Sequence, residues 1–522
     1  MAKAKKEVSM EENLWSACNK LRGKVDPAEY KHVVLWLIFL KFVSDKFEYR
    51  RQELIDEWKE KFVDSAPFYT MNNVFYLPED SRWSYIKKNG KQGDLAKLID
   101  DALNTIEKNN PSLEWALPKN YYTRLNLDKA KLASLIDDIS GITTTKDKEN
   151  DIIWRVYEYF LSKFALSEWK GKWEFYTPKS IVKLIAELIE PYKWKIYDPA
   201  CGSGGMFVQS MKFVESHHWN TKDVSIYGQE QNDTTYKLAK MNLAIRWITA
   251  DLWKEPEDTF KKDQHKDLKA DYIMANPPFN LKNWRENDEL TDDPRWDGYA
   301  VPPEWNANYW WILHMVSKLS DNNWVAWFLL ANWALKWKDN EYKIRKRLIE
   351  NDLVEAIMIL PQDMFYTTNI SVTLWIINKN KKARVSEVNW NIKNYRDRQH
   401  EILFMDLREM WIPLEKKYIQ FSEEEIDKIK YTYHTWQQVK YSTDYENIPE
   451  YCYSASLEEI RKKDYSLSPS NYIKFVDRDE WVNYDDKMKE LQKEFWELLK
   501  EEDKSKDDLL LVFKNLWYDI EY

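Results

Sequence analysis

Glycines crowd one short stretch of the chain in a way that suits ligand binding. Residues 198–205 (DPACGSGG) lie between two short apolar runs, so they predict a strand, a tight turn and the start of a helix. Gly202, Gly204 and Gly205 allow positive φ and a close approach of the backbone to a ligand. The unpaired N–H groups at a helix start favour a carboxylate or phosphate. We predict a cofactor loop, although a glycine-rich turn alone also fits a plain strand-to-helix connection.

A second stretch, residues 271–279 (DYIMANPPF), predicts a short strand that ends in a rigid turn. Pro277 and Pro278 fix φ and remove two backbone donors, which holds the Asn276 side chain and the Pro277 carbonyl as acceptors. Two such acceptors can bind both hydrogens of an adenine amino group and favour a lone pair aimed at an electrophile, without a general base. Phe279 would stack on the base, a contact of about 1–3 kcal/mol. The plain alternative is a strand-ending turn.

With these two stretches the chain resembles the modification subunit of type I restriction-modification systems, a gamma-group adenine-N(6) DNA methyltransferase. The resemblance covers most of the chain. It also rests on LWSACNKLRGKVDPAEYKHVVL near the N-terminus, EFYTP (174–178), IYGQE (226–230), LAKMNLAIR (238–246) and SASLEEIR (454–461). It implies a site-specific DNA methyltransferase (adenine-specific) that uses S-adenosyl-L-methionine. The target adenine would flip out of duplex DNA, because its amino group is inaccessible within the stack.

The resemblance also assigns roles to residues of this sequence. The EFYTP segment would line the cofactor pocket, and its place ahead of the other motifs gives the gamma-group order. Glu230 would accept hydrogen bonds from the ribose hydroxyls after a predicted strand at 224–227, and Asp251 would contact the cofactor's adenine. The alternatives are a chance surface Glu and core packing of Phe175 and Tyr176. The predicted cofactor-binding residues are Glu174, Phe175, Tyr176, Thr177, Pro178, Lys179, Asp198, Ala200, Gly202, Ser203, Gly204, Gly205, Glu230 and Asp251, and the predicted catalytic residues are Asn276, Pro277, Pro278 and Phe279.

The order of predicted elements indicates an α/β fold. Further strands are predicted at 324–330, 354–360 and 371–378. Strands that alternate with helices imply a mostly parallel, Rossmann-like sheet with ligands at the carboxyl ends of its strands.

The chain is too long for one compact domain. We predict an N-terminal helical domain (1–145), an S-adenosylmethionine-dependent methyltransferase catalytic domain (146–475) and a C-terminal helical, partner-docking tail (476–522). Residues 26–29 (DPAE) combine an N-cap acceptor, a proline at the first helical position and a carboxylate, so they predict a helix start. This helix is apolar nearly all round as far as Phe42, which predicts burial.

The C-terminal part carries apolar residues at coiled-coil-like spacing. They are Tyr484, Met488, Leu491, Phe495 and Leu498. Packing on its own domain is one interpretation, and a helix that docks a partner is the slightly favoured one.

The net charge of −9 argues against a tight grip on duplex DNA by this subunit alone, because phosphate contacts need clustered Lys and Arg. The resemblance implies a specificity subunit that determines the target sequence and holds two modification subunits. A restriction/translocase subunit would join the full complex. The chain has no GxxxxGK[ST] motif of its own for ATP-driven translocation.

The compartment predicted from the sequence is the cytoplasm. The longest apolar run, residues 33–40, is too short to span a bilayer, and the N-terminus lacks an apolar signal core. Cys18, Cys201 and Cys452 form no CxxC pair and no HExxH motif occurs, so neither a disulfide framework nor a metal site is expected.

Two other functions fit part of the pattern. Protein-glutamine methyltransferases share an Asn-Pro-Pro-aromatic motif that usually ends in Tyr, and they lack this N-terminal segment, so Phe279 favours DNA as substrate. A non-catalytic scaffold could keep the fold without binding the cofactor.

The chain contains 28 Trp and 10 Gly, whereas the usual glycine content of about 7% would give roughly 37 glycines. Trp324 and Trp333 follow asparagines where turn chemistry favours Gly. By resemblance, Gly is also expected at Trp36, Trp154, Trp173, Trp305, Trp327 and Trp517, whereas Trp311, Trp375 and Trp436 match family aromatics. Our hypothesis is that most of these Trp are UGA codons that the native host translates as Gly. The alternative is a truly Trp-rich protein.

Overall fold

The computed structural model of the chain describes residues 27–90, 94–125, 127–141, 159, 177–191, 194–286, 289–321, 325–336, 339–365, 370–388, 391–415, 418–439, 444–476 and 484–515. It divides into two compact units, Met1–Ile473 and Lys474–Tyr522.

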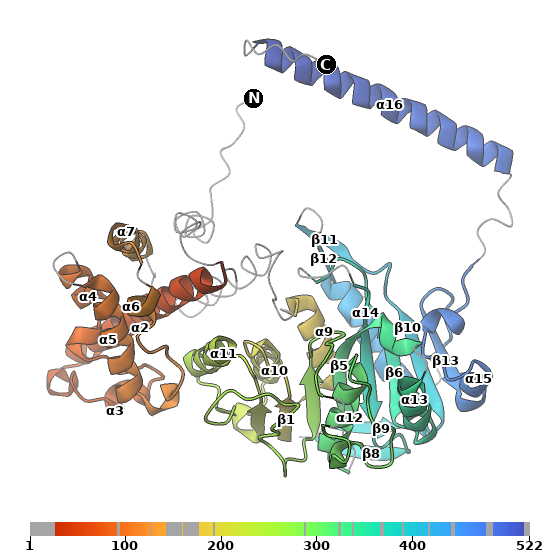
Figure 1. Ribbon diagram of the computed structural model, residues 1–522, viewed down its shortest axis with the longest axis horizontal. Helices are drawn as coiled ribbons and strands as arrows, with labels where there is room; N and C mark the ends of the chain where they lie inside the picture. Colours follow the sequence, from red (N-terminus) through yellow and green to blue (C-terminus); the bar gives the residue numbers. More distant parts are fainter. Residues whose placement is uncertain are drawn as a thin grey trace. The chain divides into compact units, whose positions relative to one another are not determined.

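A nine-stranded sheet forms the centre of the first unit (Figure 1). In spatial order its strands are β13 (Cys452–Ser456), β10 (Glu401–Asp406), β6 (Val354–Ile359), β7 (Val372–Asn378), β5 (Val325–Ala331), β4 (Tyr272–Ala275), β1 (Trp194–Asp198), β2 (Val224–Gly228) and β3 (Ala250–Asp251). Neighbours from β5 to β3 are parallel, whereas β7 is antiparallel to both its neighbours and β13 to β10. The predicted α/β, Rossmann-like fold is confirmed, and the predicted strands are present.

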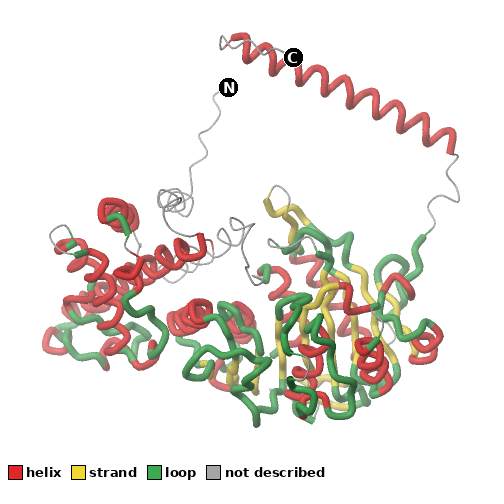
Figure 2. Tube along the Cα trace, viewed as in Figure 1, coloured by secondary structure: helices red, strands yellow, loops and turns green. Residues whose placement is uncertain are grey.

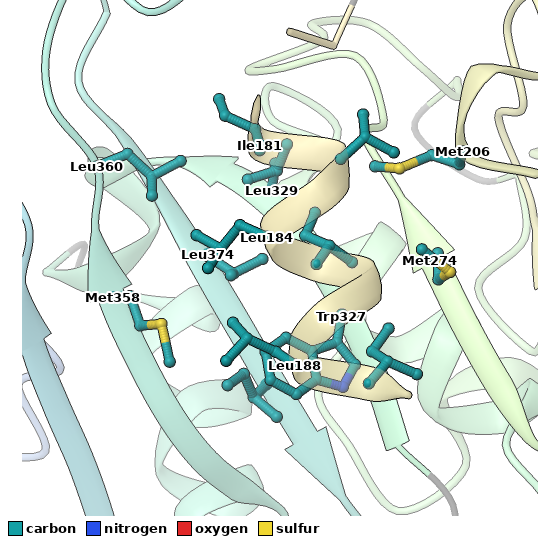
Figure 3. Packing of buried hydrophobic residues seen from close by; sticks show 14 of the residues in the cluster. Ile181, Leu184, Leu188, Met206, Met274, Trp327, Leu329, Met358, Leu360 and Leu374 are labelled. Atoms are coloured by element: carbon teal, nitrogen blue, oxygen red, sulfur yellow. The ribbon is translucent and has the colours of Figure 1, made fainter. Parts of the chain in front are cut away.

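Helices cover both faces of this sheet. They are α9 (Lys179–Ile189), α10 (Gly205–Ser216), α11 (Asp233–Ile245), α12 (Asn308–Lys318), α13 (Asn340–Glu350), α14 (Glu423–Gln437) and α15 (Leu457–Lys462). Side chains of a strand alternate between faces. Thus Trp327 and Leu329 of β5 pack in the core under α9, and Phe328 and Leu330 pack in the core on the opposite side with α12. Figure 3 shows the first of these cores, with Leu184 and Leu188 of α9 against the sheet.

The N-terminal region consists of helices and loops in its described part (Figure 2). Its helices are α2 (Pro27–Asp56), α3 (Pro67–Thr70), α4 (Trp83–Asn89), α5 (Leu95–Asn109), α6 (Tyr121–Leu125) and α7 (Lys129–Ser140). The described part of α2 begins at Pro27, and residues 33–40 are buried, as predicted. Its core includes Leu238, Met241 and Ile245 of α11, so this region packs directly on a helix of the sheet domain.

Short elements complete the first unit. They are the hairpins β8 (Arg384–Val388) with β9 (Asn391–Tyr395) and β11 (Ile412–Glu415) with β12 (Tyr418–Gln420), and the 3-10 helices η1 (Glu60–Phe62), η2 (Glu79–Ser81), η3 (Pro111–Leu113), η4 (Thr221–Asp223), η5 (Pro294–Trp296), η6 (Asn332–Leu335) and η8 (Pro469–Asn471).

The second unit is built around one long helix, α16 (Tyr484–Asn515), so the predicted C-terminal helix is confirmed. Leu491, Phe495 and Leu498 of its predicted apolar stripe are 47%, 60% and 58% exposed. Within the described residues, no helix is long and apolar enough to cross a membrane.

Candidate active site

The carboxyl ends of three neighbouring strands bring the main predicted site residues to one edge of the sheet. β1 pairs in parallel with β2 on one side and with β4 on the other. Asp198 is the last residue of β1, Glu230 follows β2 by two residues, and Asn276 directly follows β4. The strand order reverses at β1, and ligands of open α/β sheets bind at such a reversal.

The glycine-rich loop adopts a conformation that requires its glycines. Gly202 and Gly204 have φ of 54° and 75°, in the left-handed region that side chains disfavour. A Cβ at Gly202 or at Gly205 would meet no atom within 4 Å, so open space lies beside the loop. α10 begins at Gly205, and the N–H groups of its first turn are therefore available at the end of this loop. Backbone donors and open space together fit the carboxylate of a ligand.

Glu230 connects the glycine-rich loop to the segment after β2. Its Oε2 accepts from Gly202 N (3.0 Å) and its Oε1 from Asn232 N (2.8 Å). The side chain is only 7% exposed, so this is not a chance surface glutamate. Its carboxylate could also accept a hydrogen bond from a ribose hydroxyl.

The Asp198 carboxyl is buried next to this acidic group. Burial raises the pKa of Asp198 to about 8, the N–H of Ala200 opposes the rise, and the Glu230 charge adds to it. Asp198 Oδ1 accepts from Ala200 N (2.9 Å), which closes the turn directly after β1. The acidic pair therefore gives this end of the site an electrostatic character that suits hydroxyl or cationic groups of a ligand.

A hydrogen bond joins the Asn-Pro-Pro-Phe turn to the segment that precedes α9. Asn276 Nδ2 donates to Thr177 Oγ1 at 2.9 Å, across 99 residues of sequence. This bond uses the donor of the amide and fixes the plane of the side chain. Two residues predicted for opposite halves of the site, one for the cofactor and one for the base, are thus in direct contact.

Phe279 lies at the margin of the core rather than in solvent. Its ring is 8% exposed and meets Phe365 edge to face, with centroids 6.0 Å apart and planes at 78°. Phe365 follows β6 and was not among the predicted site residues. A motif-based search has no signal for it, because it is distant in sequence and typical of a core residue.

Among the described residues, no group of three or more His, Cys, Asp or Glu side chains could hold a metal ion.

Comparison with known proteins identifies the family. The profile described as N-6 DNA Methylase matches residues 148–480, and the profile of the HsdM N-terminal domain matches residues 10–139. The chain belongs to the N-6 DNA methylase family. It is 41% identical over 436 residues to the type I restriction enzyme HindI methylase subunit of Haemophilus influenzae, which covers 80% of this chain and 94% of that protein. It is 34% identical over 530 residues to the MjaIX methylase subunit of Methanocaldococcus jannaschii, covering 97% and 91%.

The fold of this N-6 DNA methylase agrees with a solved structure. The type I restriction-modification methyltransferase subunit from Streptococcus thermophilus aligns with a TM-score of 0.72 at 22% identity, over 89% of this chain and 99% of that one. The predicted family and enzyme class, an adenine-specific DNA methyltransferase subunit of a type I restriction-modification system, are confirmed.

The remaining predicted residues of this N-6 DNA methylase are placed as follows. Asp251 ends β3, one strand beyond Glu230, and is exposed; its Oδ1 accepts from Trp253 N (2.9 Å). Pro178 is the N-cap of α9 and Lys179 its first residue. Ser203 O accepts from Asn242 Nδ2 of α11 (2.7 Å). Glu174, Phe175 and Tyr176 lie outside the described residues.

The sequence did not predict that the loop at residues 257–262 lies against the carboxyl ends of β1 and β2. Gln229 Nε2 donates to the carbonyls of Glu257 (3.2 Å) and Lys262 (2.7 Å), and Thr259 Oγ1 donates to the Pro199 carbonyl (2.7 Å). These contacts hold residues 257–262 against the turn that begins the glycine-rich loop. The loop has no motif of its own, so only the fold places it here.

Proposed function

We propose that the chain transfers the methyl group of S-adenosyl-L-methionine to the exocyclic amino group of an adenine flipped out of duplex DNA. The observation that carries this proposal is the Asn276–Thr177 hydrogen bond next to the Glu230–Gly202 contact. These contacts support a rigid amide that binds the base next to an acidic, glycine-rich loop that binds the cofactor.

The residues present fit S-adenosylmethionine. The open space beside Gly202 and Gly205 and the N–H groups at the start of α10 suit its carboxylate. The Glu230 carboxylate suits its ribose hydroxyls, and Asp251 its adenine. When bound, this group supplies an electrophilic methyl.

The chain's own residues would act on the target base through acceptors. Thr177 holds the Asn276 amide so that its oxygen and the Pro277 carbonyl can bind the two amino hydrogens. Such acceptors bind more strongly as the amino group loses conjugation with the ring, so they favour the transition state. Phe279 and Phe365 form the apolar wall against which the base would stack, with movement of the Phe279 ring from its present edge contact.

The partners proposed are one specificity subunit shared by two copies of this chain, and a restriction/translocase subunit in the full complex. The side chains of Leu491, Phe495 and Leu498 on α16 are 47–60% exposed, and we assign this stripe to docking a partner subunit. Target recognition then lies outside this chain.

Two measurements test the function. Equilibrium dialysis with labelled S-adenosylmethionine should show binding, and a failure to bind would support the non-catalytic scaffold. Co-expression with the neighbouring specificity gene should give methylated adenines at one sequence motif. Methylation of protein glutamine in place of DNA would favour the alternative substrate class.

The net charge of −9 adds a prediction about the isolated chain. It should bind duplex DNA weakly and without sequence preference in gel-shift assays, because few phosphates can be neutralised. Addition of the specificity subunit should give a tight, salt-sensitive and sequence-selective complex. Tight selective binding by this chain alone would contradict the proposed division of labour.

A further inference from the structure

The turn that follows Phe279 is clamped to the start of α12 by a reciprocal pair of hydrogen bonds. Asn280 N donates to Asn308 Oδ1 (3.0 Å), and Asn308 Nδ2 donates to Asn280 Oδ1 (2.8 Å). Asn280 has φ of 53°, a left-handed conformation that asparagine tolerates better than most residues. The clamp therefore fixes the residue directly after the predicted catalytic segment.

Neighbouring contacts make this clamp rigid. Asn306 Nδ2 also donates to Asn280 Oδ1 (3.3 Å), and Asn306 Oδ1 accepts from Asn308 N (2.9 Å). Ala307 N donates to Leu281 O (3.0 Å). Asn308 itself is fully buried, and the side chains that follow it in α12 lie in the core of this face of the sheet. The position of the turn is thus coupled to a packed helix.

We propose that Asn308 is a positioning residue for methyl transfer, acting through Asn280 and not through contact with the base. This rests on the proposed function of residues 276–279. A shift of about 1 Å in reacting groups can cost on the order of 100-fold in rate, so loss of the clamp should lower kcat. None of these clamp hydrogen bonds involves residues 198–205, so cofactor affinity should be unchanged.

The test compares Asn308→Ala with Asn110→Ala in the complete complex with the specificity subunit. Asn110 is an equally buried asparagine whose amide bridges Tyr76 N (2.9 Å), Tyr76 O (2.9 Å) and Ile106 O (2.8 Å) in the N-terminal region. Both variants should lose thermal stability. Only Asn308→Ala should lose kcat, by tenfold or more, with the dissociation constant for S-adenosylmethionine within about twofold of wild type.

A milder variant keeps the test decisive if Asn308→Ala does not fold. Asn306→Ala removes one of the contacts to Asn280 and should lower kcat less. Wild-type kcat in either folded variant, or a parallel loss of cofactor affinity, would overturn the positioning role. If the wild-type complex itself does not methylate adenine, the proposed function fails instead, so the two failures are distinguishable.

An independent observation concerns the tryptophans. Five of them have positive φ, between 56° and 86°: Trp58, Trp115, Trp194, Trp247 and Trp253. Bulky residues are rare in this region, because the Cβ of an L-residue then lies too close to the following carbonyl oxygen. Most other non-glycine residues with positive φ in the described chain are Asn, Asp or His, the types that tolerate it best. Tryptophan stands out from this set.

Two of these tryptophans end helices at the position where glycine is favoured. After α2, Trp58 N donates to Ile55 O (3.0 Å) and Lys59 N to Leu54 O (2.8 Å). After α11, Trp247 N donates to Ala244 O (2.9 Å) and Ile248 N to Leu243 O (3.0 Å). Both patterns are Schellman motifs, which place a left-handed residue, usually Gly, directly after the helix. At Trp58 the side chain is 93% exposed and gains no packing in return.

The indole N–H groups also differ between tryptophans predicted to be true and tryptophans predicted to be glycine. Trp375 Nε1 donates to Thr373 Oγ1 (3.2 Å) and Trp436 Nε1 to Ser454 Oγ (2.9 Å), at two positions predicted to be true tryptophans. The buried Nε1 of Trp36 and of Trp327, both predicted to be glycine, has no hydrogen-bond partner among the described residues. Trp311, predicted to be a true tryptophan, is an exception, since its Nε1 is also unpaired there.

We infer that the native chain carries glycine at positions 58, 115, 194, 247 and 253, as a UGA codon reassigned to glycine would produce. None of these five positions was singled out from sequence. Trp333, which the sequence predicts to be glycine, lies within η6 and is not among the residues with positive φ. Trp154, Trp173, Trp324 and Trp517, also predicted to be glycine, lie outside the described residues.

Tryptic peptides of the protein from its native host test this directly. The peptides spanning residues 52–59 and 247–254 should have the masses expected for glycine at 58, 247 and 253, whereas the peptide spanning 431–440 should retain Trp436. Tryptophan in all three peptides would overturn the inference. In the chain as written, Trp58→Gly should raise Tm by about 2–4 °C, because its exposed indole contributes no packing, whereas Trp436→Gly should lower it. An unchanged or lower Tm in Trp58→Gly would also count against it.

Discussion

The turns after β1 and after β4 lie on adjacent strands of one sheet edge but are built by opposite means. The turn after β1 owes its shape to Gly202 and Gly204, which have positive φ, and it leads into α10, whose first N–H groups have no acceptor within the helix. The turn after β4 contains Pro277 and Pro278, which have no N–H, and is shaped by side-chain amides. The turn after β1 thus offers hydrogen-bond donors and is called the donor turn, and the turn after β4 offers acceptors and is called the acceptor turn. A ligand with a carboxylate fits the first, and a ligand with an amino group fits the second.

The two turns also differ in how they are supported. The first is tied to β2 through the Glu230 carboxylate and contains the buried Asp198. The second is held by neutral groups, Thr177 on one side and Asn308 on the other. Carboxylates suit the hydroxyls and the sulfonium of a cofactor. A neutral amide, by contrast, can neither transfer a proton to an adenine nor repel it by charge. Changes in the two turns should therefore affect different kinetic constants.

The largest expected effect comes from the acceptor turn. Asn276→Ala should lower kcat by about 10²–10³-fold, because its acceptor is used most strongly in the transition state. The dissociation constant for S-adenosylmethionine should stay within about twofold of wild type, as measured by equilibrium dialysis. Methyl incorporation into target duplex by the complete complex measures kcat.

Asn276→Asp sharpens this result. The carboxylate keeps an acceptor but loses the donor to Thr177, so activity should be intermediate. Thr177→Val removes the acceptor of the Asn276 N–H, so the hydrogen bond is lost and activity should fall to an intermediate level there too. Near wild-type turnover in Asn276→Ala would mean that the amide does not act on the base.

A smaller effect is expected in the donor turn, where a substitution should lower cofactor affinity and leave kcat unchanged. Glu230→Gln leaves one acceptor oxygen for Gly202 N and Asn232 N, so one of these contacts is lost together with the charge. The ribose hydroxyls would also lose their charged acceptor, and a hydrogen bond to a charged group contributes about 1.5–3 kcal/mol, so cofactor affinity should fall about tenfold or more. At saturating cofactor kcat should be close to wild type. A fall in kcat with unchanged affinity would assign Glu230 to the chemistry and undo the comparison.

The donor turn could be predicted from sequence more completely than the acceptor turn. Local periodicity and glycine spacing predicted β1, the loop and the start of α10, because all three are decided within a dozen residues. The supports of the acceptor turn come from Thr177, Asn308 and Phe365, which are remote in sequence. Long-range packing brings them together, and a single sequence contains no signal for that. The same limit explains why the tryptophans at helix ends became evident only from their φ angles.

The smallest expected effect concerns the buried Asp198, whose pKa is raised to about 8 mainly by burial. In the unfolded chain an aspartate has a pKa near 3.9, so the folded protein binds the extra proton between about pH 4 and pH 8. The protonated state therefore stabilises the fold fully below about pH 4, and this contribution is lost as pH rises through about 8. Asp198→Asn is neutral throughout and retains the Oδ1 acceptor for Ala200 N.

The difference in Tm between Asp198→Asn and wild type, measured without cofactor, should accordingly grow in favour of the variant as pH rises from 6 to 9. An effect of about 2–4 °C per kcal/mol is expected for a domain of this size, and other titrating groups cancel because both proteins contain them. S-adenosylmethionine at saturation should reduce the difference, since its positive sulfonium favours the ionised form of the Asp198 carboxyl. A pH-independent difference would show that Asp198 is already ionised at pH 6, and the donor turn would then carry a fixed negative charge beside Glu230.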